Sequence, residues 1–102
     1  MVTILIAEDD KNANKLICAV LRHAGYEPVS AADGAAAREA LEKTHIDLVI
    51  SDVMMPEMNG LELCKRIKEN QNYCHIPVIL LTAKSMISQI EEGLEAGADD
   101  YI

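Results

Sequence analysis

The sequence has few aromatic side chains and few positive charges. It contains no tryptophan or phenylalanine and only three tyrosines, so its core must be built from aliphatic side chains. Nine lysines and arginines stand against 17 aspartates and glutamates, which gives a net charge of −8. A nucleic-acid-binding surface needs clustered Lys and Arg to neutralise phosphates, so this balance argues against that function. The same acidity is compatible with carboxylates gathered around a cation.

Long hydrophobic runs are also lacking, which excludes a membrane-spanning segment. The apolar run at residues 2–7 is too short for a signal peptide, and acidic residues follow it at once. The three cysteines, Cys18, Cys64 and Cys74, are odd in number and irregularly spaced. This pattern predicts reduced thiols of a cytoplasmic protein rather than a disulfide framework. A length of 102 residues suits one small domain.

Apolar runs of strand length alternate with helical patterns along the chain. Strands are predicted at residues 2–7, 26–31, 46–51 and 77–82, with a fifth from residue 101. Helices are predicted at about residues 13–24, 34–43, 60–69 and 85–97. One apolar face of the first helix is predicted to carry Ala13, Leu16, Ile17, Val20, Leu21 and Ala24. Strict alternation indicates an α/β fold in which helices cover both faces of a parallel sheet.

Polar residues fall at the ends of three predicted strands. Glu8 and Asp9 follow the first strand, Asp52 ends the third and Thr82 ends the fourth. Ligands of open parallel sheets bind outside the carboxyl ends of the strands, where the strand order reverses. With the order 2-1-3-4-5, three carboxylates and a hydroxyl would meet there. Carboxylate oxygens suit Mg²⁺, and an aspartate beside such an ion can act as the nucleophile toward a phosphoryl group.

These residues also have simpler interpretations. The run Glu8-Asp9-Asp10 could be an acidic helix start, Asp52 a turn or capping residue, and Thr82 an ordinary strand residue. Their shared edge of the sheet favours a functional site. An aspartyl phosphatase of the haloacid dehalogenase type needs a second Asp where this chain has Met54. A flavin-binding protein needs a phosphate loop after the first strand, where the acidic run would repel a phosphate.

The chain resembles the receiver domain of two-component response regulators. The resemblance rests on four blocks, in the order and at the spacing of the family: Ile4 to Asp10, Asp47 to Gly60, Ile76 to Ala83 and Gly97 to Tyr101. Together these blocks extend the resemblance over the whole chain. It implies a flavodoxin-like doubly wound fold and a signalling phosphoacceptor that is not an enzyme.

The resemblance implies a role for each acidic residue of the site. Asp52 would be the phosphoacceptor, receiving the phosphoryl group from a phosphohistidine. Mg²⁺ would be bound directly by Asp9, through water by Glu8, and by Asp52. The backbone carbonyl of Met54 would complete the protein ligands, which leaves the Met54 side chain free to vary.

A switch and its partners are implied in the same way. Thr82 would be the switch hydroxyl, and Tyr101 the aromatic side chain that turns inward when Thr82 moves. The donor would be a sensor histidine kinase or a phosphotransfer domain. The output surface would include the fourth helix and the fifth strand. The alternative from another functional class is a degenerate receiver that only binds partners.

One departure from the family pattern concerns the C-terminus. The family has a lysine two residues beyond Ile102, followed by a proline and a fifth helix. Residues 1–102 are therefore expected to be an incomplete receiver domain without its last helix. Without that lysine we expect weak phosphoryl transfer. We also expect an apolar patch beside the first helix, where a dimer could form, as it could through the fourth helix and fifth strand.

Overall fold

The chain folds into one parallel sheet with helices on both faces. A computed structural model describes residues 1–52, 60–81 and 100–101. The strands are β1 (Thr3–Ala7), β2 (Glu27–Ala31), β3 (Leu48–Asp52), β4 (Val78–Leu81) and β5 (Asp100–Tyr101). The helices among these residues are α1 (Lys11–His23), α2 (Gly34–Lys43) and α3 (Gly60–Glu69). The strand order is β2-β1-β3-β4-β5, as predicted. The predicted fourth helix lies outside the described residues.

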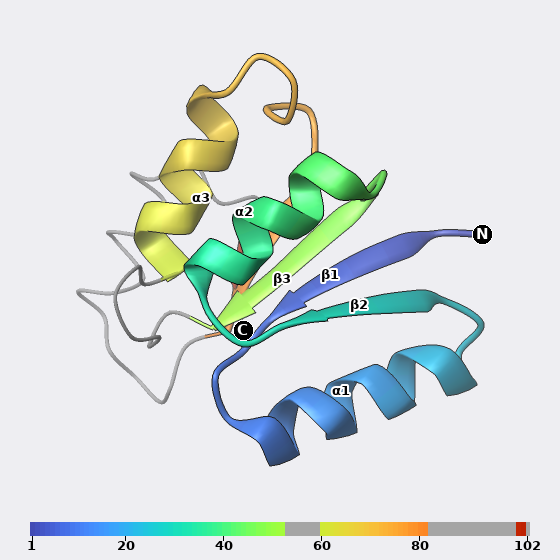
Figure 1. The fold of residues 1–102 in the computed structure, drawn as a ribbon. Coiled ribbons are helices and arrows are strands. Elements are labelled where there is room, and N and C mark those ends of the chain that lie inside the picture. Colours follow the sequence, from blue (N-terminus) through green and yellow to red (C-terminus); the bar gives the residue numbers. More distant parts are fainter. Residues whose placement is uncertain (53–59, 82–99, 102) are drawn as a thin grey trace.

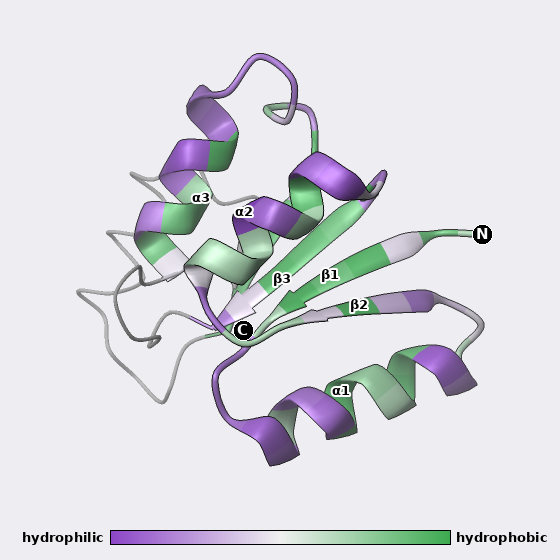
Figure 2. Ribbon diagram, viewed as in Figure 1, coloured by the Kyte–Doolittle hydropathy of each residue, from purple (hydrophilic) through white to green (hydrophobic). Residues whose placement is uncertain are grey.

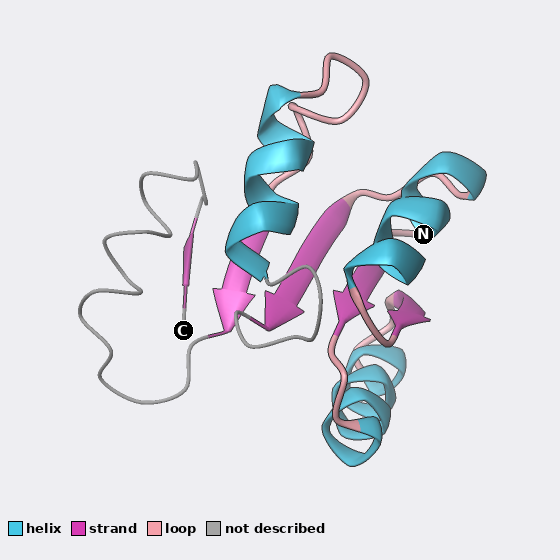
Figure 3. Ribbon diagram, turned by 60° about the vertical axis from the view of Figure 1, so that its left-hand side comes forward, coloured by secondary structure: helices cyan, strands magenta, loops and turns pink. Residues whose placement is uncertain are grey.

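Helices α2 and α3 lie on one side of the sheet and α1 on the other (Figures 1 and 3). Every strand pair is parallel, and Ala7 of β1 lies level with Ser51 of β3. Parallel neighbours need crossover connections, and the helices between the strands supply them. None of the helices in the described part of the chain is long and apolar enough to cross a bilayer.

The side chains of β1, an interior strand of the sheet, contribute to two separate cores. Leu5 and Ala7 belong to the larger core, beneath α2 and α3, whereas Ile4 and Ile6 pack with Cys18 of α1. Successive side chains of a strand point to opposite faces, so a strand covered on both faces must be apolar at every position. Figure 2 shows β1 and β3 as predominantly hydrophobic ribbons. This double burial explains why the strand sequences show no polar alternation.

Helix α1 turns only part of its predicted apolar face toward the sheet. Its buried side chains are Asn14 and Cys18, whereas Leu16 is 66% and Val20 59% exposed. Ile17 and Leu21 of that face pack against the smaller core, partly buried, while Leu16 and Val20 are left uncovered. The reason is that α1 packs over β1 and β2 at one side of the sheet, so only a narrow part of its apolar stripe is covered.

The sheet face on the α1 side remains partly open. Leu48 and Ile50 of β3 pack against the smaller core without being fully buried. Ile79 of β4 lies level with Ile50 and is also only partly buried. Together with the exposed Leu16 and Val20, these side chains leave apolar surface on this side of the molecule, as expected from the sequence.

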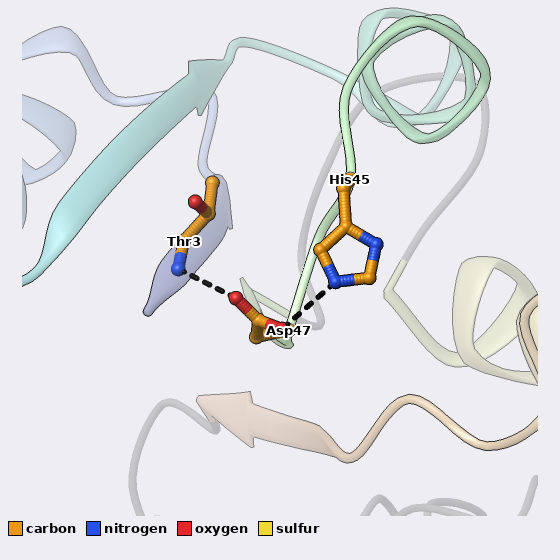
Figure 4. A network of polar contacts seen from close by, with 3 residues as sticks. All are labelled: Thr3, His45 and Asp47. Carbon is orange, nitrogen blue, oxygen red and sulfur yellow. Dashed lines mark hydrogen bonds and ion pairs between the residues drawn. The ribbon is translucent and has the colours of Figure 1, made fainter. Parts of the chain in front are cut away.

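Strand β3 begins at Leu48 rather than at the predicted residue 46. The preceding Asp47 uses its side chain to accept a hydrogen bond of 2.9 Å from the Thr3 backbone N–H, and His45 lies 3.0 Å away (Figure 4). The Thr3 N–H, followed by His45, lowers the pKa of the Asp47 carboxyl. Asp47 thus connects the loop before β3 to the start of β1, at the end of the sheet opposite the carboxyl ends of the strands.

Candidate functional site

The sheet register brings the polar residues at the ends of β1 and β3 to the same level. Because Ala7 lies beside Ser51, the next residues along the two strands, Glu8 and Asp52, come level with each other. The backbone N–H of Glu8 donates to the carbonyl of Ala31 at the end of β2, 3.0 Å away. Glu8 is therefore fixed between the two strands that flank β1.

Three carboxylates meet at this position. One carboxylate oxygen each from Glu8, Asp9 and Asp52 lies within 4.8 Å of the other two. Glu8 is buried, Asp52 is half-buried and Asp9 is exposed, so the cluster opens to solvent on one side. The structure thus brings together the three acidic residues that the sequence predicted at this edge of the sheet.

The surroundings of Glu8 raise the pKa of its carboxyl. Burial, then a hydrogen bond to Asp52 and repulsion from its charge, raise the pKa of the Glu8 carboxyl from its ordinary 4.5 to about 7. The hydrogen bond to Asp52 requires a proton, which Glu8 keeps to near-neutral pH when no cation is present. A bound cation would replace that proton, and these three carboxylates are a group that could hold one.

The third acid of the N-terminal run, Asp10, has a different role. Its side chain accepts hydrogen bonds from the backbone N–H groups of Asn12 and Ala13, at 2.9 and 3.2 Å, and so caps α1. An N-cap carboxylate also interacts favourably with the positive end of the helix dipole. The simple interpretation of an acidic helix start therefore holds for Asp10, whereas Glu8 and Asp9 are turned to the cluster.

Gly60, the first residue of α3, packs directly against the main chain of Asp52. A Cβ atom at position 60 would lie 2.1 Å from the Asp52 carbonyl oxygen and 2.9 Å from Ser51 Oγ. Only glycine allows this approach. The Ser51 hydroxyl in turn donates to the Asp52 carbonyl at 3.1 Å. Gly60 belongs to a sequence block that carries the resemblance, but no pattern in the sequence indicates that it contacts Asp52.

The other predicted site residues are placed less completely. Met54 and Thr82 lie outside the described residues. Asp52 lies level with Leu81, the residue before Thr82 in the sequence. Tyr101 is in β5, where it pairs with Leu80 of β4, and its side chain lies outside the described part of the structure.

The sequence over residues 4–102 matches the family model of the response regulator receiver domain. The chain belongs to this family. It is 47% identical over 100 residues to histidine kinase P4 of Formosa agariphila, covering 98% of this chain and 7% of that protein. It is 40% identical over 102 residues to the response regulator ArlR of Staphylococcus saprophyticus, covering 100% of this chain and 45% of that protein. This receiver domain thus spans less than half of either relative.

Solved structures of receiver domains have the same fold. A response regulator from Chloroflexus aurantiacus superimposes with a TM-score of 0.95 at 40% identity, covering 99% of this chain and 83% of that one. TrrA of Thermotoga maritima, solved in complex with Mg²⁺ and BeF, has a TM-score of 0.88 at 32% identity, covering 100% and 85%. The flavodoxin-like doubly wound fold predicted from the sequence is therefore confirmed.

Proposed function

We propose that this receiver domain accepts a phosphoryl group on Asp52 in a Mg²⁺-dependent reaction with a phosphohistidine donor. The observation that supports it is the meeting of Glu8, Asp9 and Asp52 at the carboxyl ends of β1 and β3. Asp52 is the half-buried member, on a strand end fixed by Ser51 and Gly60. A nucleophile held on a strand keeps its orientation better than one in a loop.

The proposed step is a direct transfer between the donor and Asp52. A carboxylate oxygen of Asp52 forms a bond to phosphorus as the bond from phosphorus to the donor imidazole nitrogen breaks. The electron pair of the broken bond stays on the imidazole, which takes up a proton from solvent. The product is an aspartyl phosphate. Hydrolysis would remove the phosphoryl group again: water takes it, and the Asp52 carboxylate is restored.

The carboxylates fit a magnesium ion. Hard oxygen ligands from one or two carboxylates, with water and phosphate oxygens, are what Mg²⁺ takes in phosphoryl-transfer sites. The raised pKa of Glu8 is the second support: burial, and then the neighbouring Asp52, disfavour a negative charge on Glu8 that no cation offsets. When bound, the ion would offset the charge of the carboxylates and of the phosphoryl oxygens. In this proposal Asp9 and Asp52 bind it directly, Glu8 through water and Met54 through its carbonyl.

The product would be read by residues near the end of β4 and on β5. We assign Thr82 as the hydroxyl that bonds a phosphoryl oxygen and Tyr101 as the aromatic side chain that follows it. An aspartyl phosphate adds about −1.5 to −2 of charge and new acceptor oxygens, which is enough to reposition a loop. The donor is assigned as a sensor histidine kinase or phosphotransfer domain, and the setting as the cytoplasm.

The test uses the chain with phosphoramidate, a small donor with the same phosphorus–nitrogen bond as phosphohistidine. Intact-protein mass spectrometry would follow the addition of one phosphoryl group, with and without Mg²⁺. We expect a Mg²⁺-dependent adduct that is lost in Asp52→Asn. In parallel, beryllofluoride with Mg²⁺ should shift the NMR signals of Glu8 and Asp9.

Two control variants remove one negative charge each, as Asp52→Asn does. Asp10→Asn removes an acid of the same run whose side chain caps α1, and Asp47→Asn removes an acid just before the opposite end of β3. Both should accept the phosphoryl group as the wild type does. A wild-type chain that responds to neither phosphoramidate nor beryllofluoride would refute the proposal and favour a receiver that only binds partners. Turnover of a simple phosphoester, abolished by Asp52→Asn, would favour an enzyme.

A further inference from the structure

The side chain of Asn14 is the only buried amide in the described part of the chain, and it lies behind the acidic cluster. Asn14 is on the inward face of α1 and is 6% exposed. Its amide nitrogen donates to the backbone carbonyl of Glu8 at 3.0 Å and to that of Ala31 at 3.2 Å. Its carbonyl oxygen accepts from the Ser30 hydroxyl at 2.7 Å and the Cys18 thiol at 3.4 Å. All the hydrogen-bonding capacity of the amide is used.

These bonds hold the acidic run at both ends. The Asn14 side chain binds the carbonyl of Glu8, and the Asn14 backbone N–H donates to the carbonyl of Asp10 at 2.9 Å. Asp9 therefore sits in a short turn whose two ends are attached to one residue of α1. The second donor bond, to Ala31, connects this turn to the end of β2. Asn14 also lines a shallow hollow at the surface together with Glu8 and Asp9.

We propose that Asn14 is a positioning residue for the cation site, because it fixes the main chain that presents Glu8 and Asp9 to the ion. This inference rests on the proposed function, since it assumes that the cluster binds Mg²⁺. Once Glu8 is ionised, as ion binding requires, the three carboxylates repel one another, and this repulsion favours movement of the turn carrying Glu8 and Asp9 away from Asp52. The amide of Asn14 opposes that movement at the Glu8 carbonyl. Groups that orient metal ligands in this way typically change metal affinity by about 10–100-fold when removed.

Asn14 could instead serve only the packing of α1 on the strands. The two roles predict different results. A packing role would affect the stability of the fold alone, whereas a positioning role would also affect the affinity for Mg²⁺. Ser30→Ala is the matched control: it removes the hydrogen bond from Ser30 to the Asn14 carbonyl oxygen but leaves the bonds to Glu8 and Ala31. Asn14→Ala removes all four bonds.

The experiment is a Mg²⁺ titration of the wild type, Asn14→Ala and Ser30→Ala, followed by the NMR signal of the Asp9 amide. Urea unfolding of each protein is measured in the same buffer. We expect Asn14→Ala to raise the Mg²⁺ Kd about tenfold or more, while Ser30→Ala keeps the wild-type Kd even where it lowers the urea midpoint. Unchanged Mg²⁺ affinity in Asn14→Ala would overturn the inference, and so would an equal loss of affinity in both variants.

A second measurement needs no variant, in case Asn14→Ala does not fold. The side-chain amide signals of Asn14 are followed in the wild type during the same titration, with the exposed Asn12 as reference. We expect the Asn14 signals to move with the saturation curve of the Asp9 amide, because the carbonyl they bond belongs to Glu8. Stationary Asn14 signals beside a moving Asp9 signal would overturn the inference while leaving Mg²⁺ binding intact. A wild type in which Asp9 does not respond at all would overturn both proposals.

Discussion

Replacing Glu8 by glutamine should stabilise the metal-free protein at neutral pH. The pKa of Glu8 is raised from 4.5 to about 7, so between these values the folded state holds a proton that the unfolded state has lost. A folded state that binds more protons becomes less stable as pH rises. The contribution of the protonated Glu8 to stability is complete below pH 4.5, declines as pH rises, and is gone above about pH 7. Glu8→Gln carries no titrating group and should not show this decline.

The size of the effect follows from the pKa. A rise from 4.5 to about 7 is about 2.5 pH units, and each unit corresponds to about 1.36 kcal/mol between the two protonation states. The ceiling is therefore about 3 kcal/mol, reached above pH 7. Because the cluster opens to solvent on the side of the exposed Asp9, solvent screening brings the measured value below this ceiling. For a domain of about this size, 1 kcal/mol corresponds to a Tm change of roughly 4–8 °C, so the two proteins should differ clearly in melting.

The assay is urea unfolding of both proteins in EDTA from pH 4.5 to 8, followed by far-UV circular dichroism because the chain has no tryptophan. Glu39→Gln is a control of opposite sign. The exposed Glu39 pairs with Lys43, which lowers the pKa of Glu39. Its replacement should weaken the fold slightly above pH 4.5, where that pair is charged. Parallel pH profiles for the wild type and Glu8→Gln would refute the argument that Glu8 is destabilised by burial and by Asp52.

Three further substitutions test the supports of the site. Gly60→Ala would place a Cβ 2.1 Å from the Asp52 carbonyl oxygen, so we expect about 1–3 kcal/mol of destabilisation together with weaker Mg²⁺ binding, both measured by urea unfolding with and without the ion. Asp10→Ala removes the α1 cap and should destabilise by about 1 kcal/mol in urea while leaving Mg²⁺ affinity unchanged in calorimetry. The Thr3 N–H lowers the pKa of Asp47, so the contribution of the Asp47 carboxylate to stability is present above pH 3.8 and lost in acid. In urea unfolding at a series of acid pH values, Asp47→Asn should therefore lose less stability than the wild type as the pH falls.

The sheet and the cluster could be predicted from the sequence because they follow from strong, regular signals. Continuous apolar runs define strands that are buried on both faces, and the helical segments between them require parallel neighbours. Once the order β2-β1-β3-β4-β5 is given, Glu8, Asp9 and Asp52 can only lie at the same edge. The prediction succeeded for these residues because backbone topology alone sets their positions.

The details that could not be predicted depend on tertiary contacts. Leu16 and Val20 fit a helical apolar stripe, but how much of that stripe is covered depends on where α1 crosses the sheet. Asn14 looks like an ordinary polar residue of a helix until its four hydrogen bonds are seen. The contact of Gly60 with Asp52 arises from the packing of α3 against β3, which no local pattern encodes. Tertiary contacts of this kind leave no periodic pattern in the sequence.

The instability of the carboxylate cluster and its affinity for a cation are linked through Glu8. An ion that needs the deprotonated Glu8 competes with its proton below about pH 7, so Mg²⁺ affinity should rise with pH and level off there. At 100 times its Kd, a ligand adds about 2.7 kcal/mol of stability to a protein that binds it. At pH 8, Mg²⁺ should therefore stabilise the wild type more than Glu8→Gln and narrow the stability gap between them, because the variant lacks one carboxylate of the site. If the ion stabilises both proteins equally, Glu8 is not part of its surroundings, and Asp9 and Asp52 hold it alone.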